Sequence, residues 1–183
     1  MLIGPGLAAD DLPGDLKETA GEMWLQSSMP IVVDASALDW LPPGTFHDKA
    51  IRVITPHPGE AARLLGSTVD EVQADRVEAL RALSAKFGDC WVVLKGQHTL
   101  IGRSEGQILV NPTGNPGLGQ GGSGDLLAGY LAGLLAQPLL LEDVFHTIRY
   151  AVWQHGAAAD ELASQAPNWV VEDLAKCIGA VQA

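Results

Sequence analysis

The chain has 183 residues, of which 47% are hydrophobic and 18% charged, a balance typical of a globular protein with one substantial core. Its formal charge of −11 argues against broad contact with nucleic acid or an anionic membrane surface, because both attract lysine and arginine. Cys90 and Cys177 lack the spacing of a disulfide framework or a zinc site, and we recognise no signal peptide or membrane-spanning run. We therefore expect a cytoplasmic protein.

The first half of the chain alternates helical patterns with short apolar runs. Met1–Leu7 looks like the end of a buried strand that enters a turn at Gly4-Pro5-Gly6. The apolar periodicity predicts a second strand over Ile31–Ala35 and a third β-rich run over Ala50–Thr55. Helices are predicted over Asp10–Ser28, Glu60–Leu65 and Ser67–Phe87.

The second half continues the alternation. Trp91–Leu94 is short, apolar and β-branched, which predicts a buried strand. Leu100–Gly102 and Gln107–Val110 flank a polar turn and predict an antiparallel hairpin. Helices are predicted over Leu126–Gln137, Leu141–Ala163 and Val170–Val181. The whole pattern predicts a single α/β domain over residues 1–183, in which helices cover a largely parallel sheet to give three layers.

Polar residues stand where several predicted strands end, and ligands of open α/β sheets bind beyond such ends. Asp34 is explained equally well as a site residue or as a helix N-cap. His57 lies between two prolines that restrict the backbone, which favours ligand contact. Lys95 precedes a glycine and can place its ammonium near a phosphate, although a lysine facing water is the alternative. We interpret His146 and His155, in the long helical stretch, as structural.

The densest glycine run lies in Asn111–Asp125. Six of the twelve residues from Gly114 to Asp125 are glycine, and the run ends on a carboxylate directly before a predicted helix. Dense glycine indicates positive φ angles or a close approach of the backbone to a ligand. Unpaired N–H groups and the dipole at a helix N-terminus favour an anion. The segment therefore predicts a site that holds phosphate and moves a proton at Asp125.

Two common nucleotide motifs do not explain this loop. Gly119–Gly124 satisfies G-x-G-x-x-G, but the nearest strand ends at Val110 and no acid follows at the end of a second strand. A Walker A loop is excluded because no Gly-Lys-Ser/Thr is present. Helix-terminal amides at Gly121–Asp125, a lysine and one base would suffice for phosphoryl transfer from a nucleotide that carries a divalent metal.

Four blocks then become recognisable in one order, Gly4-Pro5-Gly6, Thr55–Glu60, Val93–Gly96 with Thr99, and Asn111–Gly117 through Asp125. Together they resemble the ADP/ATP-dependent NAD(P)H-hydrate dehydratase family of the ribokinase-like superfamily, over essentially the whole chain. That family repairs hydrated NADH and NADPH, in which water has added to the nicotinamide ring. A nucleotide, typically ADP in bacteria, phosphorylates the added hydroxyl, and phosphate leaves to restore the ring.

The resemblance implies a role for each matching residue. Asp125 would be the base that activates the hydroxyl and would also contact the substrate, and Asn115 would lie near the reacting phosphate. Gly4, Gly6 and His57 would line the hydrated nicotinamide site. The nucleotide would be held by Lys95, Gly96, Gln97, His98, Thr99, Gly122, Ser123 and Gly124. The resemblance also implies Mg²⁺, ADP or ATP as phosphoryl donor, and a homo-oligomer, with no metal site built from protein side chains.

Three departures leave alternatives open. The family domain normally has about a hundred further residues before the Gly-Pro-Gly turn, judged against typical domain sizes. We therefore expect either a fragment or a chain completed by a partner. Ala8 and Gln120 also stand where the family usually has other residues. The alternative functions are a ribokinase-like kinase for a vitamin precursor, and a truncated chain that binds nucleotide without chemistry.

Overall fold

The computed structural model describes residues 1–8, 12–47 and 50–181. Its sheet has six strands in sequential order. The first four run parallel to one another, and the last two continue the sheet antiparallel. The strands are β1 (Leu2–Ile3), β2 (Ile31–Val33), β3 (Arg52–Ile54), β4 (Trp91–Leu94), β5 (Leu100–Gly102) and β6 (Leu109–Val110). The predicted α/β class and the predicted hairpin are both confirmed.

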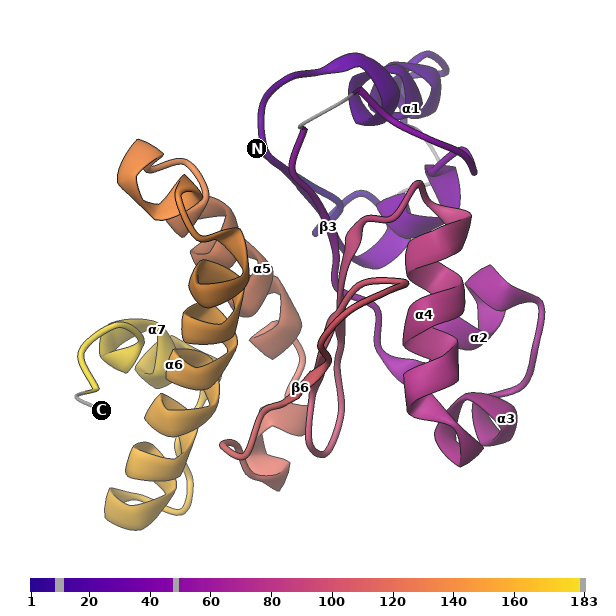
Figure 1. Ribbon diagram of the computed structural model, residues 1–183. Coiled ribbons are helices and arrows are strands. Elements are labelled where there is room, and N and C mark those ends of the chain that lie inside the picture. Colours follow the sequence, from indigo (N-terminus) through magenta and orange to yellow (C-terminus); the bar gives the residue numbers. More distant parts are fainter. Residues whose placement is uncertain (9–11, 48–49, 182–183) are drawn as a thin grey trace.

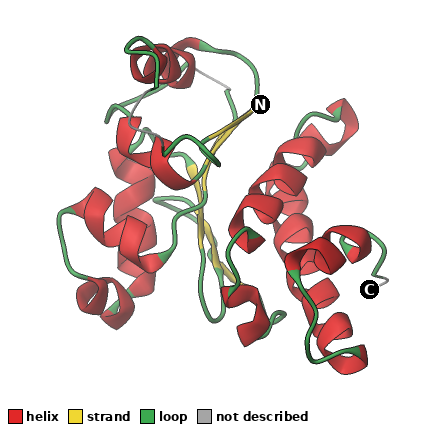
Figure 2. Ribbon diagram, turned by 180° about the vertical axis from the view of Figure 1, so that it is seen from behind, coloured by secondary structure: helices red, strands yellow, loops and turns green. Residues whose placement is uncertain are grey.

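Helices cover both faces of the sheet, which gives the three predicted layers (Figures 1 and 2). One layer holds α1 (Leu16–Gln26), the 3₁₀ helix η1 (Ala35–Trp40), α2 (Pro58–Leu65), α3 (Val69–Ala74) and α4 (Arg76–Lys86). The other layer holds α5 (Ser123–Leu134) and α6 (Val144–Gln165), with α7 (Val171–Cys177) packed against α6. Two further 3₁₀ helices are η2 (Pro116–Gly119) and η3 (Pro138–Leu141).

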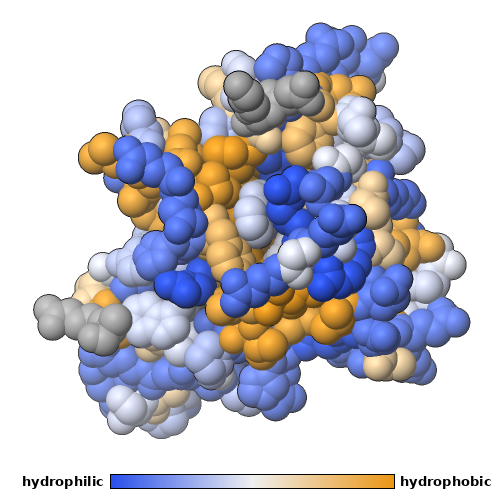
Figure 3. All heavy atoms as spheres, viewed as in Figure 1, coloured by the Kyte–Doolittle hydropathy of each residue, from blue (hydrophilic) through white to orange (hydrophobic). Residues whose placement is uncertain are grey.

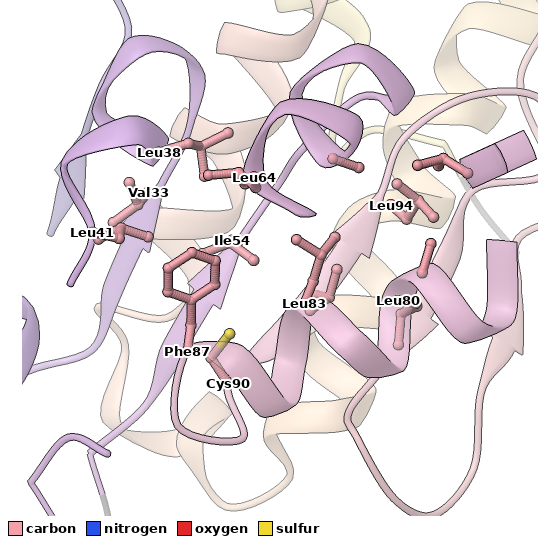
Figure 4. Close-up of a cluster of buried hydrophobic side chains, with 14 of the residues drawn as sticks. Val33, Leu38, Leu41, Ile54, Leu64, Leu80, Leu83, Phe87, Cys90 and Leu94 are labelled. Carbon is pink, nitrogen blue, oxygen red and sulfur yellow. The ribbon is translucent and has the colours of Figure 1, made fainter. Parts of the chain in front are cut away.

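The inner strands β2 to β5 are largely buried on both faces, and their side chains divide the core in two. Ile31 and Val33 of β2 point to the layer of α1 to α4, whereas Val32 between them points to α5 and α6. Figure 4 shows the first half of the core, in which Phe87 and Leu83 pack against Ile54. The strands therefore form a rigid centre, and their carboxyl ends present side chains at one edge.

Several predicted boundaries were wrong, and two have a clear cause. Ser67–Phe87 is not one helix, because the Asp75 side chain accepts the Glu78 amide at 2.9 Å and begins a new helix, α4. The helix predicted from Leu126 begins three residues earlier, after Gly122 with a φ of 87°. Residues 9–11, which include the start of the predicted first helix, lie outside the described residues, and α1 begins at Leu16.

The remaining shifts are smaller. The predicted runs Ile31–Ala35, Ala50–Thr55 and Gln107–Val110 shorten to β2, β3 and β6, and the predicted helix at Glu60 begins two residues earlier as α2. The last two helices are displaced by a few residues to the bounds of α6 and α7, and η1, η2 and η3 were not predicted. Such ends depend on local hydrogen bonds that apolar periodicity does not report.

Hydrophobic residues reach the surface in several separate places (Figure 3), and the exposed large ones belong to several elements. Val110 of the edge strand β6 is one of them and is 55% exposed. Within the described ranges, no helix combines the length and the apolar character that crossing a membrane requires.

Candidate active site

Charged side chains from three parts of the chain meet at the carboxyl edge of the sheet. Lys95, directly after β4, places Nζ 2.8 Å from Oδ1 of Asp34, which directly follows β2. The same Nζ lies 3.9 Å from Oε2 of Glu60 in the first turn of α2. The side chains of Asp34, Glu60 and Lys95 are only 1%, 9% and 18% exposed, so the Lys95 ammonium attracts both carboxylates in a poorly solvated setting. We call these three residues the charge cluster.

The turn after β1 lies against the same cluster. Gly4 has a φ of 138°, and a Cβ there would come within 1.7 Å of the Asp34 carbonyl oxygen. Only glycine fits this close approach. Gly6 has a φ of 81° and is exposed, with open space at the position of a Cβ. The first glycine therefore positions the turn on Asp34, and the second leaves room in front of it.

His57 begins α2 and is fixed by it. Its Nδ1 accepts hydrogen bonds from the Gly59 and Glu60 amides at 3.0 and 3.3 Å, and its own amide donates to Glu60 Oε2 at 2.7 Å. Because Nδ1 is an acceptor, the neutral ring carries its proton on Nε2. Nε2 lies 3.5 Å from Glu60 Oε1 on a side chain that is 54% exposed. His57 can thus offer an N–H donor to a ligand, and Glu60 links it to Lys95.

The loop that carries Lys95 to Thr99 is held by an arginine that sequence reasoning missed. Arg76, the first residue of α4, donates to the carbonyls of Leu94, Lys95 and Gln97. Thr99 closes the loop by donating its hydroxyl to the Gly96 carbonyl at 3.1 Å. Gly96 has a φ of 131°, and a Cβ there would lie 3.3 Å from the guanidinium of Arg76. Gln97 and His98 are exposed at the tip, with a φ of 55° at His98.

The glycine run ends in the first turn of α5, close to the charge cluster. A Cβ at Gly124 would lie 3.1 Å from Lys95 Nζ, so the helix N-terminus packs directly on the ammonium. The Ser123 amide donates to the Gln120 carbonyl at 3.3 Å. Throughout the described ranges, the amides of Gly122, Gly124 and Asp125 have no backbone or side-chain acceptor. Such free amides at a helix N-terminus are suited to an anion.

Asp125 extends from this first turn. Its side chain is exposed, and no described residue forms a hydrogen bond or ion pair with its carboxylate. By contrast, the Asp34 carboxylate is paired with Lys95, and Glu60 is bonded to the His57 amide. Asp125 is therefore the acid of this edge that is free to accept a proton from a ligand, beside amides and an ammonium that favour a phosphate.

Helix α6 supports the glycine run from behind. His155 is buried, and its Nε2 lies 3.0 Å from the Ser123 carbonyl oxygen and 3.2 Å from the Ser123 hydroxyl. Burial lowers the pKa of His155 to about 4, so the ring is neutral at neutral pH and donates from Nε2 to the carbonyl. The position agrees with a structural role. His146 is exposed beside Arg149, at 2.8 Å, on the same helix.

Asn115 is held in one orientation at the start of the run. Its side-chain oxygen accepts the Gly117 amide at 2.9 Å, and its Nδ2 donates to Oδ1 of Asp160 at 3.0 Å. Asp160 lies on α6, and its other oxygen accepts the Gly114 amide at 2.8 Å. Asn115 and Ser123, the two ends of the run, are thus both attached to α6.

Arg76, Glu60 and Asp160 take part here and were not among the predicted site residues. Asp34 had two open alternatives: it stands at the N-cap position of η1, but its side chain makes no capping hydrogen bond and pairs with Lys95. Glu60 had a recognisable signal, because an acid three residues after an N-cap is the spacing of a capping box. Asp160 had none, because its partner Gly114 lies 46 residues away in sequence.

Comparisons with known proteins agree with this arrangement. A family model described as NAD(P)H-hydrate dehydratase matches residues 1–179. The ADP-dependent (S)-NAD(P)H-hydrate dehydratase of Neisseria meningitidis is 44% identical over 152 residues, which are 80% of this chain and 50% of that protein. The bifunctional NAD(P)H-hydrate repair enzyme of Moorella thermoacetica is 42% identical over 90% of this chain and 30% of its own length.

Solved structures give the same answer. The ADP/ATP-dependent NAD(P)H-hydrate dehydratase of Bacillus subtilis, co-crystallised with ATP and Mg²⁺, superposes with a TM-score of 0.80 at 32% identity, covering 98% of this chain and 63% of its own. A ribokinase-like superfamily protein from Enterococcus faecalis superposes with a TM-score of 0.76 at 29% identity, covering 98% and 61%. The fold is ribokinase-like. The chain spans between 30% and 63% of these relatives' lengths, and over that span it belongs to the NAD(P)H-hydrate dehydratase family.

Proposed function

We propose that this chain carries the catalytic edge of a nucleotide-dependent dehydratase that restores hydrated NADH or NADPH. The observation that carries the proposal is the first turn of α5. There Asp125 has a free carboxylate, the Gly124 amide is unpaired, and Lys95 Nζ lies 3.1 Å from where a Gly124 Cβ would be. A base, an anion-binding amide and a cation in one turn are the groups that phosphoryl transfer to a hydroxyl requires.

The chemistry balances as a phosphorylation followed by an elimination. Asp125 takes the proton of the added ring hydroxyl while the oxygen attacks the terminal phosphoryl group of the nucleotide. With ADP as the donor, AMP is the leaving group. The ring carbon–oxygen bond then breaks, the ring gives up a proton from the neighbouring carbon, and phosphate departs. The unpaired amides of α5 and the Lys95 ammonium would stabilise the phosphate charge in both steps. The Nε2–H of His57 would donate a hydrogen bond to the substrate.

The nucleotide would lie along the Lys95–Thr99 loop and the α5 N-terminus, because Arg76 holds the start of this loop and Gly124 of α5 lies close to Lys95 Nζ. Among the described side chains, no group of three or more acids, histidines or cysteines is placed to hold a metal ion. We therefore infer that Mg²⁺ enters with the nucleotide phosphates, as in many phosphoryl-transfer sites, and we assign it no protein ligand.

The substitution Asp125→Asn tests the proposal. Hydrated NADH is incubated with ADP or ATP, and the return of NADH absorbance is followed. We expect nucleotide-dependent recovery by the native protein and a loss of about a hundredfold or more in kcat for the variant, because a positioned base contributes about that much. Since the Asp125 carboxylate has no partner in the described structure, the variant should unfold at the same urea concentration as the native protein. Equal turnover by both proteins would refute the assignment.

The two alternatives predict different products. A vitamin-precursor kinase would release a stable phosphorylated alcohol, and a chain without chemistry would bind ADP in calorimetry but produce no AMP. The hydroxyethylthiazole kinase of Pyrococcus horikoshii superposes with a TM-score of 0.68 at 14% identity, a likeness of fold alone. No contact in the described site favours a kinase over the dehydratase.

The remaining expectations stay predictions. They are a single domain over residues 1–183, a homo-oligomer, a partner or further segment that completes the substrate pocket, and a cytoplasmic location. Gel filtration with light scattering measures the mass in solution and so tests whether the chain forms a homo-oligomer.

A further inference from the structure

Helix α6 contacts the glycine-rich loop at the loop's first residues, Thr113 and Gly114. The Thr113 hydroxyl donates to the Trp153 carbonyl at 3.0 Å. One turn further along α6, Gly156 packs so closely on the loop that a Cβ there would lie 2.3 Å from the Thr113 hydroxyl and 2.7 Å from its carbonyl. Asp160, the next turn, then accepts the Gly114 amide at 2.8 Å. The loop therefore packs on α6 through backbone groups as well as side chains.

The second oxygen of Asp160 reaches a group with a predicted role in the reaction. It accepts the Asn115 side-chain amide at 3.0 Å, while the Asn115 oxygen accepts the Gly117 amide at 2.9 Å. These two bonds fix which end of the amide is nitrogen. A side-chain amide nitrogen carries two hydrogens, so one Asn115 N–H remains for a ligand. A carboxylate acceptor on the first hydrogen also polarises the amide and strengthens the bond that the second can donate.

The far end of the loop is attached to the same helix. His155 holds Ser123 through its carbonyl oxygen, and Asp160 holds Asn115. These two residues of α6 are five positions apart, which corresponds to about 7.5 Å along a helix axis. The start of the loop and the first turn of α5 are thus both attached to this one stretch of α6, with Gly124 and Asp125 directly after Ser123.

We propose that Asp160 is a positioning residue that directs the free Asn115 N–H toward the phosphate held at the N-terminus of α5. Neither Asp160 nor its contact follows from the family resemblance described above. The inference rests on the proposed function for its kinetic consequence, whereas the orientation of Asn115 by Asp160 can be measured without turnover. Asp160 contacts no reacting atom and acts through Asn115.

The first test compares Asp160→Asn with Glu161→Gln, which removes the same charge from the neighbouring exposed acid of α6. The ¹⁵N-labelled proteins are titrated with inorganic phosphate. We expect the Asn115 side-chain amide signal to shift in the native protein and in Glu161→Gln. In Asp160→Asn the shift should be lost, because an amide in place of the carboxylate no longer accepts both donors. An equal shift in all three proteins would overturn the proposal, whether or not the chain turns over hydrated NADH.

The second test is kinetic. Losing hydrogen bonds to a charged acceptor corresponds to about a tenfold or larger effect, so we expect kcat to fall by about that factor in Asp160→Asn with a smaller change in the KM for ADP. In an Asn115→Ala background, Asp160→Asn should lower kcat no further. A further fall there would show that Asp160 acts independently of Asn115, and would overturn the proposal. If the native protein itself shows no turnover, the proposed function fails and the phosphate titration alone decides this inference.

Discussion

The site has two regions that differ in whether their polar and charged groups have partners within the protein. At the front, the exposed Asp125 side chain and the amides of Gly122 and Gly124 have no partner in the described structure. Behind them, Lys95 is paired with Asp34 and Glu60, and His155 is bonded to Ser123, all of them largely buried. Unpaired polar groups are affordable in water and costly in the interior. The free groups therefore mark where a ligand binds, and the satisfied groups hold them in place, with Lys95 at the boundary because we also assign its ammonium to the phosphate.

This difference predicts that the two regions respond oppositely to mutation. A change at the front should lower activity and leave the free energy of unfolding unaltered, as proposed above for Asp125→Asn. A change in the region behind should lower the free energy of unfolding, because it leaves a buried group without its partner. The following predictions probe that contrast, beginning with the largest expected effect on stability.

Lys95→Met should destabilise the protein strongly. It leaves the Asp34 carboxylate, which is 1% exposed, without its cation, and removing one partner of a buried ion pair costs about 3–5 kcal/mol. Urea unfolding monitored by tryptophan fluorescence measures the change. Lys176→Met is the matched control, because that lysine pairs with Asp173 on the surface and is 73% exposed. The control should change stability little. Similar small effects for both variants would mean that the charge cluster is not a buried pair.

His155 should make the stability depend on pH. Burial lowers its pKa to about 4 from an ordinary value of 6.5, so the unfolded chain binds a proton in a pH range where the folded chain does not. The stabilisation is complete above the unfolded pKa and is lost as the pH falls toward the folded one. We expect a loss of about 3 kcal/mol between about pH 7 and pH 4.

The variant His155→Gln isolates this contribution. Glutamine does not titrate, and its amide can still donate to the Ser123 carbonyl. Other groups titrate in both proteins, so the difference between their unfolding free energies should change with pH by the amount given above. If the two proteins have parallel pH profiles, the pKa of His155 is the same in the folded and unfolded states, and burial does not lower it.

The same contrast explains which parts were predictable from the sequence. The strands β2 and β4 are short apolar runs that pack on both faces, and the glycine run ending in Asp125 carries its conformational requirement in its residue types. The front of the site was therefore predicted from local pattern.

Lys95 and Asp34 were singled out one by one, but their pairing and the contacts of Asp160 were not predicted, for two reasons. Lys95 and Asp34 are 61 residues apart and meet only because β2 and β4 lie in one sheet, and Asp160 acts across a helix packing that periodicity does not report. The division of Ser67–Phe87 had a local signal, because Asp75 caps the amide three residues later, but apolar spacing continued through it.

The smallest expected effect on stability comes from Gly124→Ala. This residue lies where the two regions meet, so its effects on stability and on ADP affinity can be compared directly. The added Cβ would stand 3.1 Å from Lys95 Nζ, so the ammonium must move by a few tenths of an ångström, and alanine at the same time favours helix. We expect the free energy of unfolding to change by less than about 1 kcal/mol, while the affinity for ADP measured by calorimetry falls about tenfold because the anion loses its place beside the helix. Gly129→Ala, in the same helix with open space around it, should stabilise by up to about 1 kcal/mol and leave ADP affinity unchanged. If both alanines leave ADP affinity unchanged, the contact between Lys95 and α5 belongs to the buried support alone, and the nucleotide phosphate lies elsewhere on the front.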